Sequence, residues 1–262
     1  MTNAADNAGR FTGLAETYQK HRPDYPAAAM EQVAGFWAQA PGVPRRLADV
    51  GGGTGKSLTA LLPVLGAGWT AAVVEPNDDM RAQAERAFAG LPGVTAVKGG
   101  AEALPFPDGA LGLVMAAQAL HWFDRPRFYA EAARVLAPGG TLLILYNNRD
   151  LYDDPLSAAF EDLAEGAIPG YSRDYRNWDL MAELKALAWP REVVEYSHPW
   201  TWQLTPEGFA GLMLSRSKMT PFRESLGEAA AQAAIRDLAR RHTGPDGTVG
   251  LRYVTQAICV RK

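Results

Sequence analysis

The chain has 262 residues, a net charge of −3 and a hydrophobic fraction of 47%. This length is enough for one α/β domain with a large core, and the hydrophobic fraction is that of an ordinary globular protein. Acidic and basic residues are interspersed without a basic stripe, so nucleic acid is not expected as the main partner. No apolar run reaches the length of a membrane span, and the polar segment 1–9 lacks a signal-peptide core. Cys259 is the single cysteine, which excludes an internal disulfide, and a cytoplasmic location is expected.

The first part of the chain alternates between predicted helices and strands. Apolar residues at helical spacing predict a first helix over 27–40. From residue 47 to residue 146 the alternation predicts a parallel sheet with helices on both faces. Asn77 is the expected N-cap of one helix, and Pro138-Gly139-Gly140 is the expected end of another. The predicted strands are 47–50, 69–75, 94–98, 111–117 and 141–146, and the predicted helices between them are 55–66, 78–89 and 126–136.

After residue 150 this rhythm changes, and helical patterns predominate. Alternating residues predict a strand over 192–202, which Pro199 places near a sheet edge. A last strand is predicted over 249–260. The predicted helices of this part are 155–166, 178–188, 206–215 and 221–241.

Residues 47–57 read Leu-Ala-Asp-Val-Gly-Gly-Gly-Thr-Gly-Lys-Ser, from the end of a predicted strand to the start of a helix. Glycines let a ligand approach the backbone closely, so this loop is predicted to be a nucleotide or cofactor cradle. A phosphate-binding P-loop would need glycine at Val50, and a dinucleotide fingerprint would need glycine at Lys56. A third pattern, Asp-x-Gly-x-Gly-x-Gly, is matched in full by Asp49, Gly51, Gly53 and Gly55.

Further segments follow this loop in a recognisable order. Glu75 ends the second predicted strand, where an acid can accept hydrogen bonds from both hydroxyls of a ribose. With 99–108, 113–123 and 131–140, the loop and Glu75 resemble the motifs of class I S-adenosylmethionine-dependent methyltransferases. The segment 11–26 is similar to the N-terminal lid of small-molecule enzymes of the trans-aconitate methyltransferase type. The resemblance covers roughly residues 11–147.

The resemblance implies an α/β, Rossmann-like, doubly wound fold. Its sheet would have seven mostly parallel strands with the last strand antiparallel, plus an N-terminal helical lid and a C-terminal helical insertion. The whole chain, 1–262, would then be a single methyltransferase domain. Its expected parts are the lid (11–40), the cofactor-binding core (45–148), a substrate-side insertion including a strand (150–225), and a terminal helix and strand (226–262).

The cofactor implied is S-adenosyl-L-methionine. The glycines would approach its methionine part, and Asp49 would order the loop or reach the ammonium group through water. Ala101 and Glu102 would face the adenine, on which Met80 either packs or is plain core. Arg22 and Tyr18 would close over the carboxylate, although Arg22 also suits an ordinary surface position. The expected cofactor-binding residues are Tyr18, Arg22, Asp49, Gly51, Gly53, Gly55, Glu75, Pro76, Met80, Ala101, Glu102 and Gln118.

His121 is the candidate general base, because it follows the fourth strand at the carboxyl edge where α/β sheets bind ligands. The alternative is that His121 and Trp122 only stack under the cofactor or cap a turn. Aromatic residues of the insertion favour a flat or hydrophobic substrate, although each ring also suits a core position. The expected substrate-binding residues are Trp122, Tyr146, Tyr171, Tyr175, Trp178 and Trp202.

A catalytic metal is not expected, because Asn147-Asn148 stand where the metal-dependent type has acids, and Asp124 is the only acid at this edge. The Asn/Asp-Pro-Pro-Tyr/Phe motif of amino-group methyltransferases is replaced by 117–122. The expected function is therefore methyl transfer to an O, N or C nucleophile of a small metabolite, as in secondary metabolism. Two alternatives stay open: a non-catalytic cofactor-sensing or partner-binding module of the same fold, and a nucleotide-dependent enzyme. A homodimer is compatible with the sequence.

Overall fold

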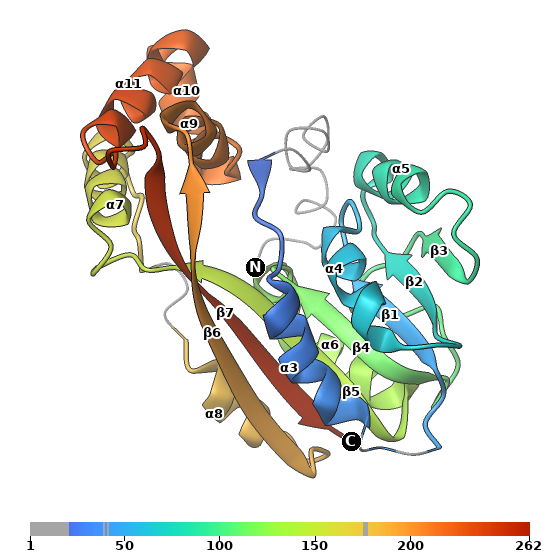
Figure 1. Cartoon of the computed structure of the whole chain (residues 1–262). Helices are drawn as coiled ribbons and strands as arrows, with labels where there is room; N and C mark the ends of the chain where they lie inside the picture. The colour runs from blue at the N-terminus through green and yellow to red at the C-terminus, as the bar shows by residue number, and fades with distance from the viewer. Residues whose placement is uncertain (1–20, 39, 41, 175–177) are drawn as a thin grey trace.

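The computed structural model describes residues 21–38, 40, 42–174 and 178–262. Its strands are β1 (Arg46–Val50), β2 (Thr70–Val74), β3 (Val94–Val97), β4 (Leu111–Ala117), β5 (Leu136–Arg149), β6 (Glu192–Leu204) and β7 (Val249–Arg261). They form one seven-stranded sheet in the order β3-β2-β1-β4-β5-β7-β6 (Figure 1). Strands β1 to β5 pair in parallel, and β7 runs antiparallel to both β5 and β6. The predicted Rossmann-like sheet with an antiparallel last strand is thereby confirmed.

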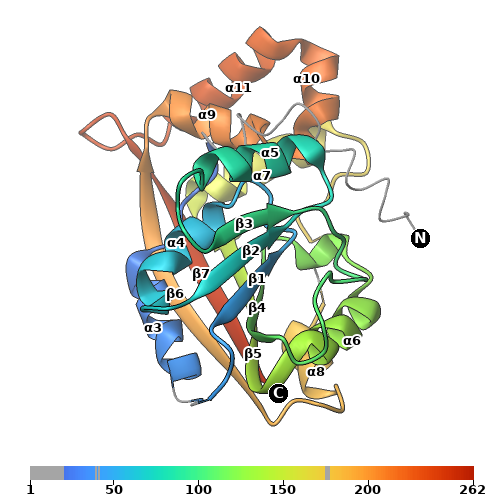
Figure 2. The ribbon, with the colours of Figure 1, turned by 90° about the vertical axis from the view of Figure 1, so that its right-hand side faces the viewer.

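Helices cover both faces of this sheet, as Figure 2 shows. One face packs on α3 (Ala27–Ala38), α4 (Lys56–Leu65) and α5 (Asp78–Ala87), and the other on α6 (Arg125–Val135) and α8 (Leu180–Lys185). All seven residues of β4 are buried, because this strand lies at the centre of the sheet between β1 and β5. Burial on both faces explains why β4 is a continuous apolar run rather than an alternating one.

A group of helices surrounds the far ends of β6 and β7, and we call it the helical cap. It consists of α7 (Pro155–Ala167), α9 (Pro206–Leu214), η2 (Ser217–Met219), α10 (Thr220–Leu226) and α11 (Glu228–Arg240). The cap has its own apolar core, in which Phe160 of α7 meets Phe209 of α9 edge to face with ring centroids 6.0 Å apart. Figure 1 shows the cap beyond the end of the sheet at which β5 leads into α7.

Two of the differences from the predicted boundaries concern Pro138-Gly139-Gly140 and Gly227. Strand β5 begins at Leu136 and runs through Pro138-Gly139-Gly140, because a register shift against β4 accommodates these residues within the strand. The helix predicted over 221–241 is two helices, α10 and α11. Gly227 separates them with φ +80°, a conformation that glycine adopts at little cost.

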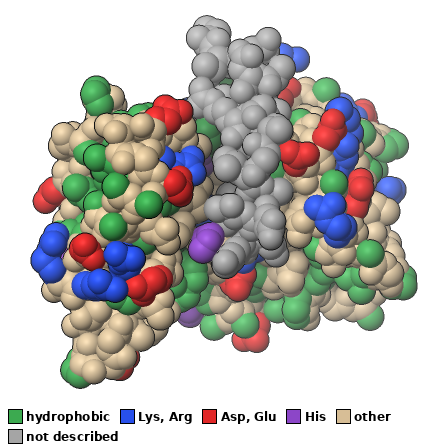
Figure 3. Space-filling view, turned by 90° about the horizontal axis from the view of Figure 1, so that it is seen from above, with side chains coloured by type: hydrophobic (Ala, Val, Ile, Leu, Met, Phe, Trp, Pro, Cys, Tyr) green, Lys and Arg blue, Asp and Glu red, His purple; other side chains and the backbone are tan. Residues whose placement is uncertain are grey.

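The surface seen in Figure 3 carries acidic and basic side chains in mixed order over both the cap and the core helices. Within the described ranges, none of the helices combines the length and the apolar character that a membrane crossing would require.

Candidate cofactor and substrate site

The glycine-rich loop lies at the carboxyl end of β1, beside the end of β2. Gly51 N donates to the Val74 carbonyl oxygen at 2.8 Å. Gly51, Gly53 and Gly55 have φ values of 64°, 58° and 84°, which L side chains rarely adopt. The three glycines of the motif are therefore required by the backbone of the turn itself.

Gly52 is a site residue that the motif does not include. A Cβ atom at this position would lie 2.8 Å from Cγ of Asp49 and 2.8 Å from Cγ1 of Val73. Such contacts are too short for real Cβ atoms, so the loop can cross the Asp49 side chain only with glycine here. The run of three consecutive glycines was the signal that could have found it.

Asp49 is fully buried beneath this loop. Ser57 Oγ donates to its Oδ2 at 2.7 Å, which ties the end of β1 to the first turn of α4. Burial raises the pKa of Asp49 from 3.8 to about 7, although the Ser57 hydrogen bond and the Leu58 amide oppose the rise. This carboxyl is therefore poised to change its charge near neutral pH.

The raised pKa predicts how Asp49 affects stability. Between about pH 4 and pH 7 the folded protein holds a proton on Asp49 that the unfolded chain releases. The free energy of unfolding should therefore fall as the pH rises through this window, by up to about 1.4 kcal/mol per pH unit. We expect the free energy of unfolding of Asp49→Asn, measured by urea denaturation, to change less with pH across this range. The exposed control Asp153→Asn should keep the wild-type slope, and an unchanged slope in Asp49→Asn would contradict the assignment.

Glu75 is buried at the end of β2, and its carboxylate is held by two backbone amides. Gly53 N donates to Oε2 at 3.0 Å, and Asn77 N donates to Oε1 at 2.8 Å. Burial raises the pKa of Glu75, against the effect of these two hydrogen bonds. The carboxylate thus joins the glycine loop to the start of α5. There Asn77 is the N-cap, as predicted, and accepts from Met80 N at 3.0 Å.

The remaining predicted cofactor residues surround the same edge of the sheet. Pro76 is exposed directly after Glu75, whereas Met80 and Ala101 are buried. Glu102 is half-buried, and its Oε1 accepts from Asp124 N at 2.9 Å. This bond fixes the segment after β3 against the N-terminus of α6, where Asp124 is the N-cap residue.

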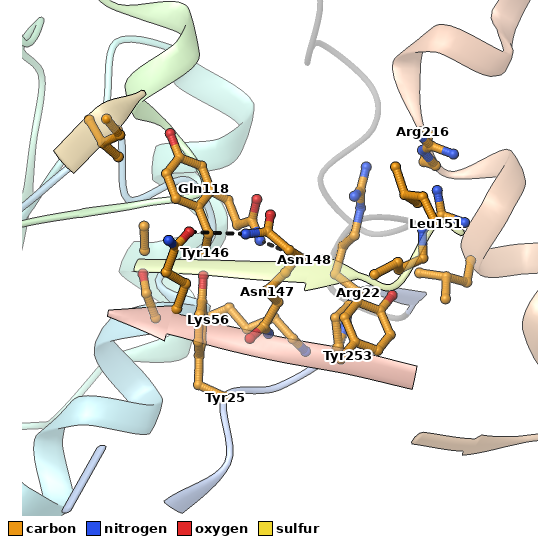
Figure 4. A pocket seen from close by; sticks show the side chains of 18 of the residues that line it. Arg22, Tyr25, Lys56, Gln118, Tyr146, Asn147, Asn148, Leu151, Arg216 and Tyr253 are labelled. Carbon is orange, nitrogen blue, oxygen red and sulfur yellow. Dashed lines mark hydrogen bonds between the residues drawn. The ribbon is translucent and has the colours of Figure 1, made fainter. Parts of the chain in front are cut away.

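A cavity of about 820 Å³ lies between this edge of the sheet and the helical cap, and Figure 4 shows part of its wall. The glycine loop supplies Gly51 to Gly53 and the ends of β4 and β5 supply Gln118, Tyr146 and 147–149. The cap side supplies Leu212, Met213, Arg216 and Tyr253. The predicted cofactor loop and two of the predicted substrate residues, Tyr146 and Trp178, thus open into one space.

Gln118 lies directly after β4 and is the one described non-glycine residue with positive φ, at 53°. Its backbone N donates to the Leu145 carbonyl oxygen and its Nε2 to the Asn147 carbonyl oxygen, both at 2.9 Å. Unfavourable backbone conformations of this kind concentrate at ligand sites. In Figure 4 the Gln118 side chain lies beside Tyr146 at the cavity.

The structure separates the predicted residues into three groups. Arg22, Gly51, Gly53, Gln118, Tyr146 and Trp178 line the cavity. Tyr18 and Tyr175 lie outside the described residues. The rest are not on the cavity wall. Seven lie at the cofactor edge of the sheet: Asp49, Gly55, Glu75, Pro76, Met80, Ala101 and Glu102. The other four are His121, Trp122, Tyr171 and Trp202.

The local packing explains these four positions. The short helix η1 (Leu120–Trp122) buries Leu120 and leaves His121 and Trp122 half-buried, with their rings 4.8 Å apart. The Tyr171 hydroxyl donates to Oε2 of Glu161 at 2.8 Å. The Trp202 ring packs on Tyr253 at a centroid distance of 6.4 Å, on the apolar core of the cap.

The segment 22–25 also contributes to the wall through Arg22, Pro23 and Tyr25, of which only Arg22 was a predicted site residue. Asp24 forms an ion pair with Lys56 Nζ at 2.7 Å, and its carbonyl oxygen accepts from Asn147 Nδ2 at 3.2 Å. Arg22 Nη2 donates to the Ser215 carbonyl oxygen at 3.4 Å. These bonds connect the segment to α4, to β5 and to the cap, and Lys56 has a carboxylate partner where a P-loop lysine would hold phosphate.

Comparison with known proteins agrees with this architecture. A methyltransferase domain family matches residues 48–144. An uncharacterised methyltransferase of Mycobacterium bovis is 31% identical over 252 residues, which cover 96% of this chain and 94% of that protein. A ubiquinone/menaquinone biosynthesis C-methyltransferase of Methylobacterium nodulans is 41% identical over 107 residues, 39% of this chain and 42% of that protein.

A solved structure extends the likeness over nearly the whole fold. The putative type II methyltransferase from Anaeromyxobacter dehalogenans has a TM-score of 0.66 and 25% identity, covering 92% of this chain and 96% of that chain. The sheet order, the glycine loop and a relative matched along almost its full length lead to one assignment. The chain belongs to the family of class I, S-adenosylmethionine-dependent methyltransferases.

Proposed function

We propose that the chain binds S-adenosyl-L-methionine at the loop 49–55 and transfers its methyl group to a small molecule in the adjoining cavity. One observation carries the proposal: Gly53 lines the cavity and also donates its amide to Glu75. The loop that would hold the methionine part and the carboxylate that would hold the ribose are thus directly bonded at the cavity edge.

The residues present fit this cofactor. The loop offers backbone without side chains toward the cavity, which permits close approach of a ligand. Below it, the buried Asp49 accepts from Ser57 Oγ and would hold the loop in this shape. Met80, Ala101 and Glu102 would surround the adenine, with Pro76 at its edge, and Gln118 would contact the methionine end.

The sulfonium cofactor supplies an already activated methyl group, so the chain must align the acceptor and exclude water. Alignment alone can lower a barrier by about 7–11 kcal/mol in favourable cases. None of the described residues lining the cavity is a histidine. We therefore propose that positioning supplies most of the rate, with His121 retained as a base only if a substrate-bound state brings it to the cavity.

The wall of the cavity supports a small, partly flat substrate. Tyr146 is buried at the end of β5, and Trp178 faces the same space beneath Arg125, whose Cζ lies 5.0 Å from the indole centroid. These rings would sandwich or flank an apolar part of the acceptor. The nucleophile, whether O, N or C, stays open. The cytoplasmic location, the homodimer, the absence of a metal and a role in secondary metabolism remain predictions.

Calorimetric titration of the full chain with S-adenosylhomocysteine, NAD and ATP tests the proposal. We expect one site for S-adenosylhomocysteine and no heat of binding with the two nucleotides. Binding of NAD or ATP instead would favour the nucleotide-dependent alternative, and absence of S-adenosylhomocysteine binding would refute the proposal. A screen of small acceptors for release of S-adenosylhomocysteine then separates an enzyme from a non-catalytic module.

A further inference from the structure

Guanidinium groups gather at the cap end of the cavity. Arg149 at the end of β5 and Arg216 after α9 both line it, and their side chains are only 8% and 14% exposed. Arg22 lines the same end, where it reaches the Ser215 carbonyl oxygen. In Figure 4 Arg22 and Arg216 lie on the side of Leu151 and Tyr253, away from Gln118. We call Arg22, Arg149 and Arg216 the arginine cluster.

One buried carboxylate holds two members of this cluster, Arg149 and Arg216. Glu161 of α7 is 1% exposed, and its Oε1 accepts from Arg149 Nη2 and, at 3.2 Å, from Arg216 Nη1. Its Oε2 accepts from the Tyr171 hydroxyl. Two guanidinium groups therefore share a single carboxylate oxygen. Two cations that share one oxygen repel each other, and burial together with the neighbouring charge of Arg216 lowers the pKa of Arg149.

The acids on the cavity wall are placed differently. Asp174, Asp179 and Glu195 are all exposed. Each also accepts a hydrogen bond from a neighbour, from the Tyr152 hydroxyl, from Ala182 N and from Gln256 Nε2 respectively. Solvent screens exposed charges far more than buried ones. Among the described residues, the buried end of the cavity therefore carries more positive than negative charge, although the chain as a whole has a net charge of −3.

We propose that the arginine cluster binds an anionic group, a carboxylate or a phosphate, on the methyl acceptor. Guanidinium groups match the planar or forked oxygen pairs of these anions through paired hydrogen bonds. This inference rests on the proposed function, and it adds a charged end to the apolar substrate expected from the aromatic residues.

The position of the cluster also constrains the length of the acceptor. Tyr146 and Arg149 are three residues apart on β5. Because a strand rises about 3.3 Å per residue, their Cα atoms are about 10 Å apart. Tyr146 and Gln118 lie beside the glycine loop, where the methyl group would be delivered. The anionic group is thus a handle at the opposite end of the acceptor from the atom that receives the methyl group.

The test uses three probes of similar shape: phenylacetate, phenyl phosphate and the uncharged phenylacetamide. Each is titrated calorimetrically into the full chain saturated with S-adenosylhomocysteine. We expect at least one anion to bind about tenfold or more tightly than the amide, since hydrogen bonds to charged groups are the strong ones. The ratio between phenylacetate and phenyl phosphate identifies which anion the cluster prefers.

Arg216→Gln should weaken binding of the preferred anion about tenfold to a hundredfold and leave the amide and S-adenosylhomocysteine affinities unchanged. Arg216→Lys keeps the charge and is the second variant if Arg216→Gln fails to fold. It should lose part of the preference for the anion over the amide. The control Arg240→Gln removes an exposed arginine of the cap that pairs with Glu207, and should change nothing.

Two results would overturn the inference while S-adenosylhomocysteine still binds. One is equal affinity of the wild-type chain for the amide and both anions, and the other is an anion preference that survives in both Arg216 variants. Loss of S-adenosylhomocysteine binding by the wild-type chain would instead refute the proposed function, so the two failures are distinguishable.

Discussion

The Glu75→Gln variant is expected to bind S-adenosylhomocysteine at least about a hundredfold more weakly than the wild-type chain. Each oxygen of Glu75 already accepts one backbone amide, from Gly53 or from Asn77, and each retains a second lone pair. Two ribose hydroxyls donating to these positions would each contribute about 1.5–3 kcal/mol, as hydrogen bonds to charged groups do. Together they correspond to a factor of about a hundred or more in affinity.

Glutamine has nearly the same shape as glutamate but cannot reproduce this arrangement. Its NH₂ group must face either Gly53 N or Asn77 N, so one donor meets another donor and the loop loses a bond. One ribose hydroxyl loses its acceptor, and the other is left with an uncharged oxygen. Isothermal titration calorimetry measures the difference. The control is Glu85→Gln. Glu85 is an exposed residue of α5 whose Oε1 lies 3.8 Å from Arg81 Nε, and this variant should bind S-adenosylhomocysteine as tightly as the wild-type chain. An affinity of Glu75→Gln within about threefold of wild type would show that Glu75 does not hold the ribose.

The Glu161→Ala variant is expected to have a free energy of unfolding about 3–5 kcal/mol lower than the wild-type chain, because it removes one partner of a buried ion pair. The reason is that Arg149 and Arg216 would remain buried without the carboxylate oxygen they share. Burial on its own would raise the pKa of Glu161, but these two arginines outweigh it and hold the pKa below its ordinary value. The pair of guanidinium groups also flanks Phe160, with Cζ atoms 5.5 Å and 5.7 Å from the ring centroid, so repulsion would be transmitted into the cap core.

Urea denaturation followed by tryptophan fluorescence checks this value against a matched variant. Glu207→Ala removes another glutamate that pairs with an arginine in the cap, but both side chains of that pair are more than half exposed. Its cost should stay within about 1 kcal/mol, the usual range for an exposed pair. Equal losses in the two variants would mean that the buried carboxylate does not offset the charge of the arginine cluster.

The sequence predicts those parts of the fold that local patterns determine. The continuous apolar run of β4 and the helix N-cap Asn77 each depend on residues of a single element. Both are found where they were predicted. The Asp49-to-Gly55 motif is equally local, because its glycines are required by the φ angles of one turn. Even Glu75, some distance along the chain, could be predicted because parallel strands bring their carboxyl ends to one edge.

The parts that could not be predicted depend on contacts between distant segments. The arginine cluster joins the last residue of β5, one residue after α9 and one before α3, and no spacing rule connects them. The aromatic residues show the opposite problem. Alternation along β6 predicts a strand, but only the packing of the cap decides that Trp202 contacts Tyr253 and is not on the cavity wall. In the same way, the turn that buries Leu120 decides the position of His121.

A crystal structure of the chain with S-adenosylhomocysteine tests the central claim most directly. We predict that both ribose hydroxyls lie within hydrogen-bond distance of the Glu75 carboxylate. We also predict that the homocysteine part crosses Gly51 and Gly53, and that the sulfur faces the cavity beside Gln118 and Tyr146. A ligand bound elsewhere, or one whose sulfur faces away from the cavity, would contradict the account.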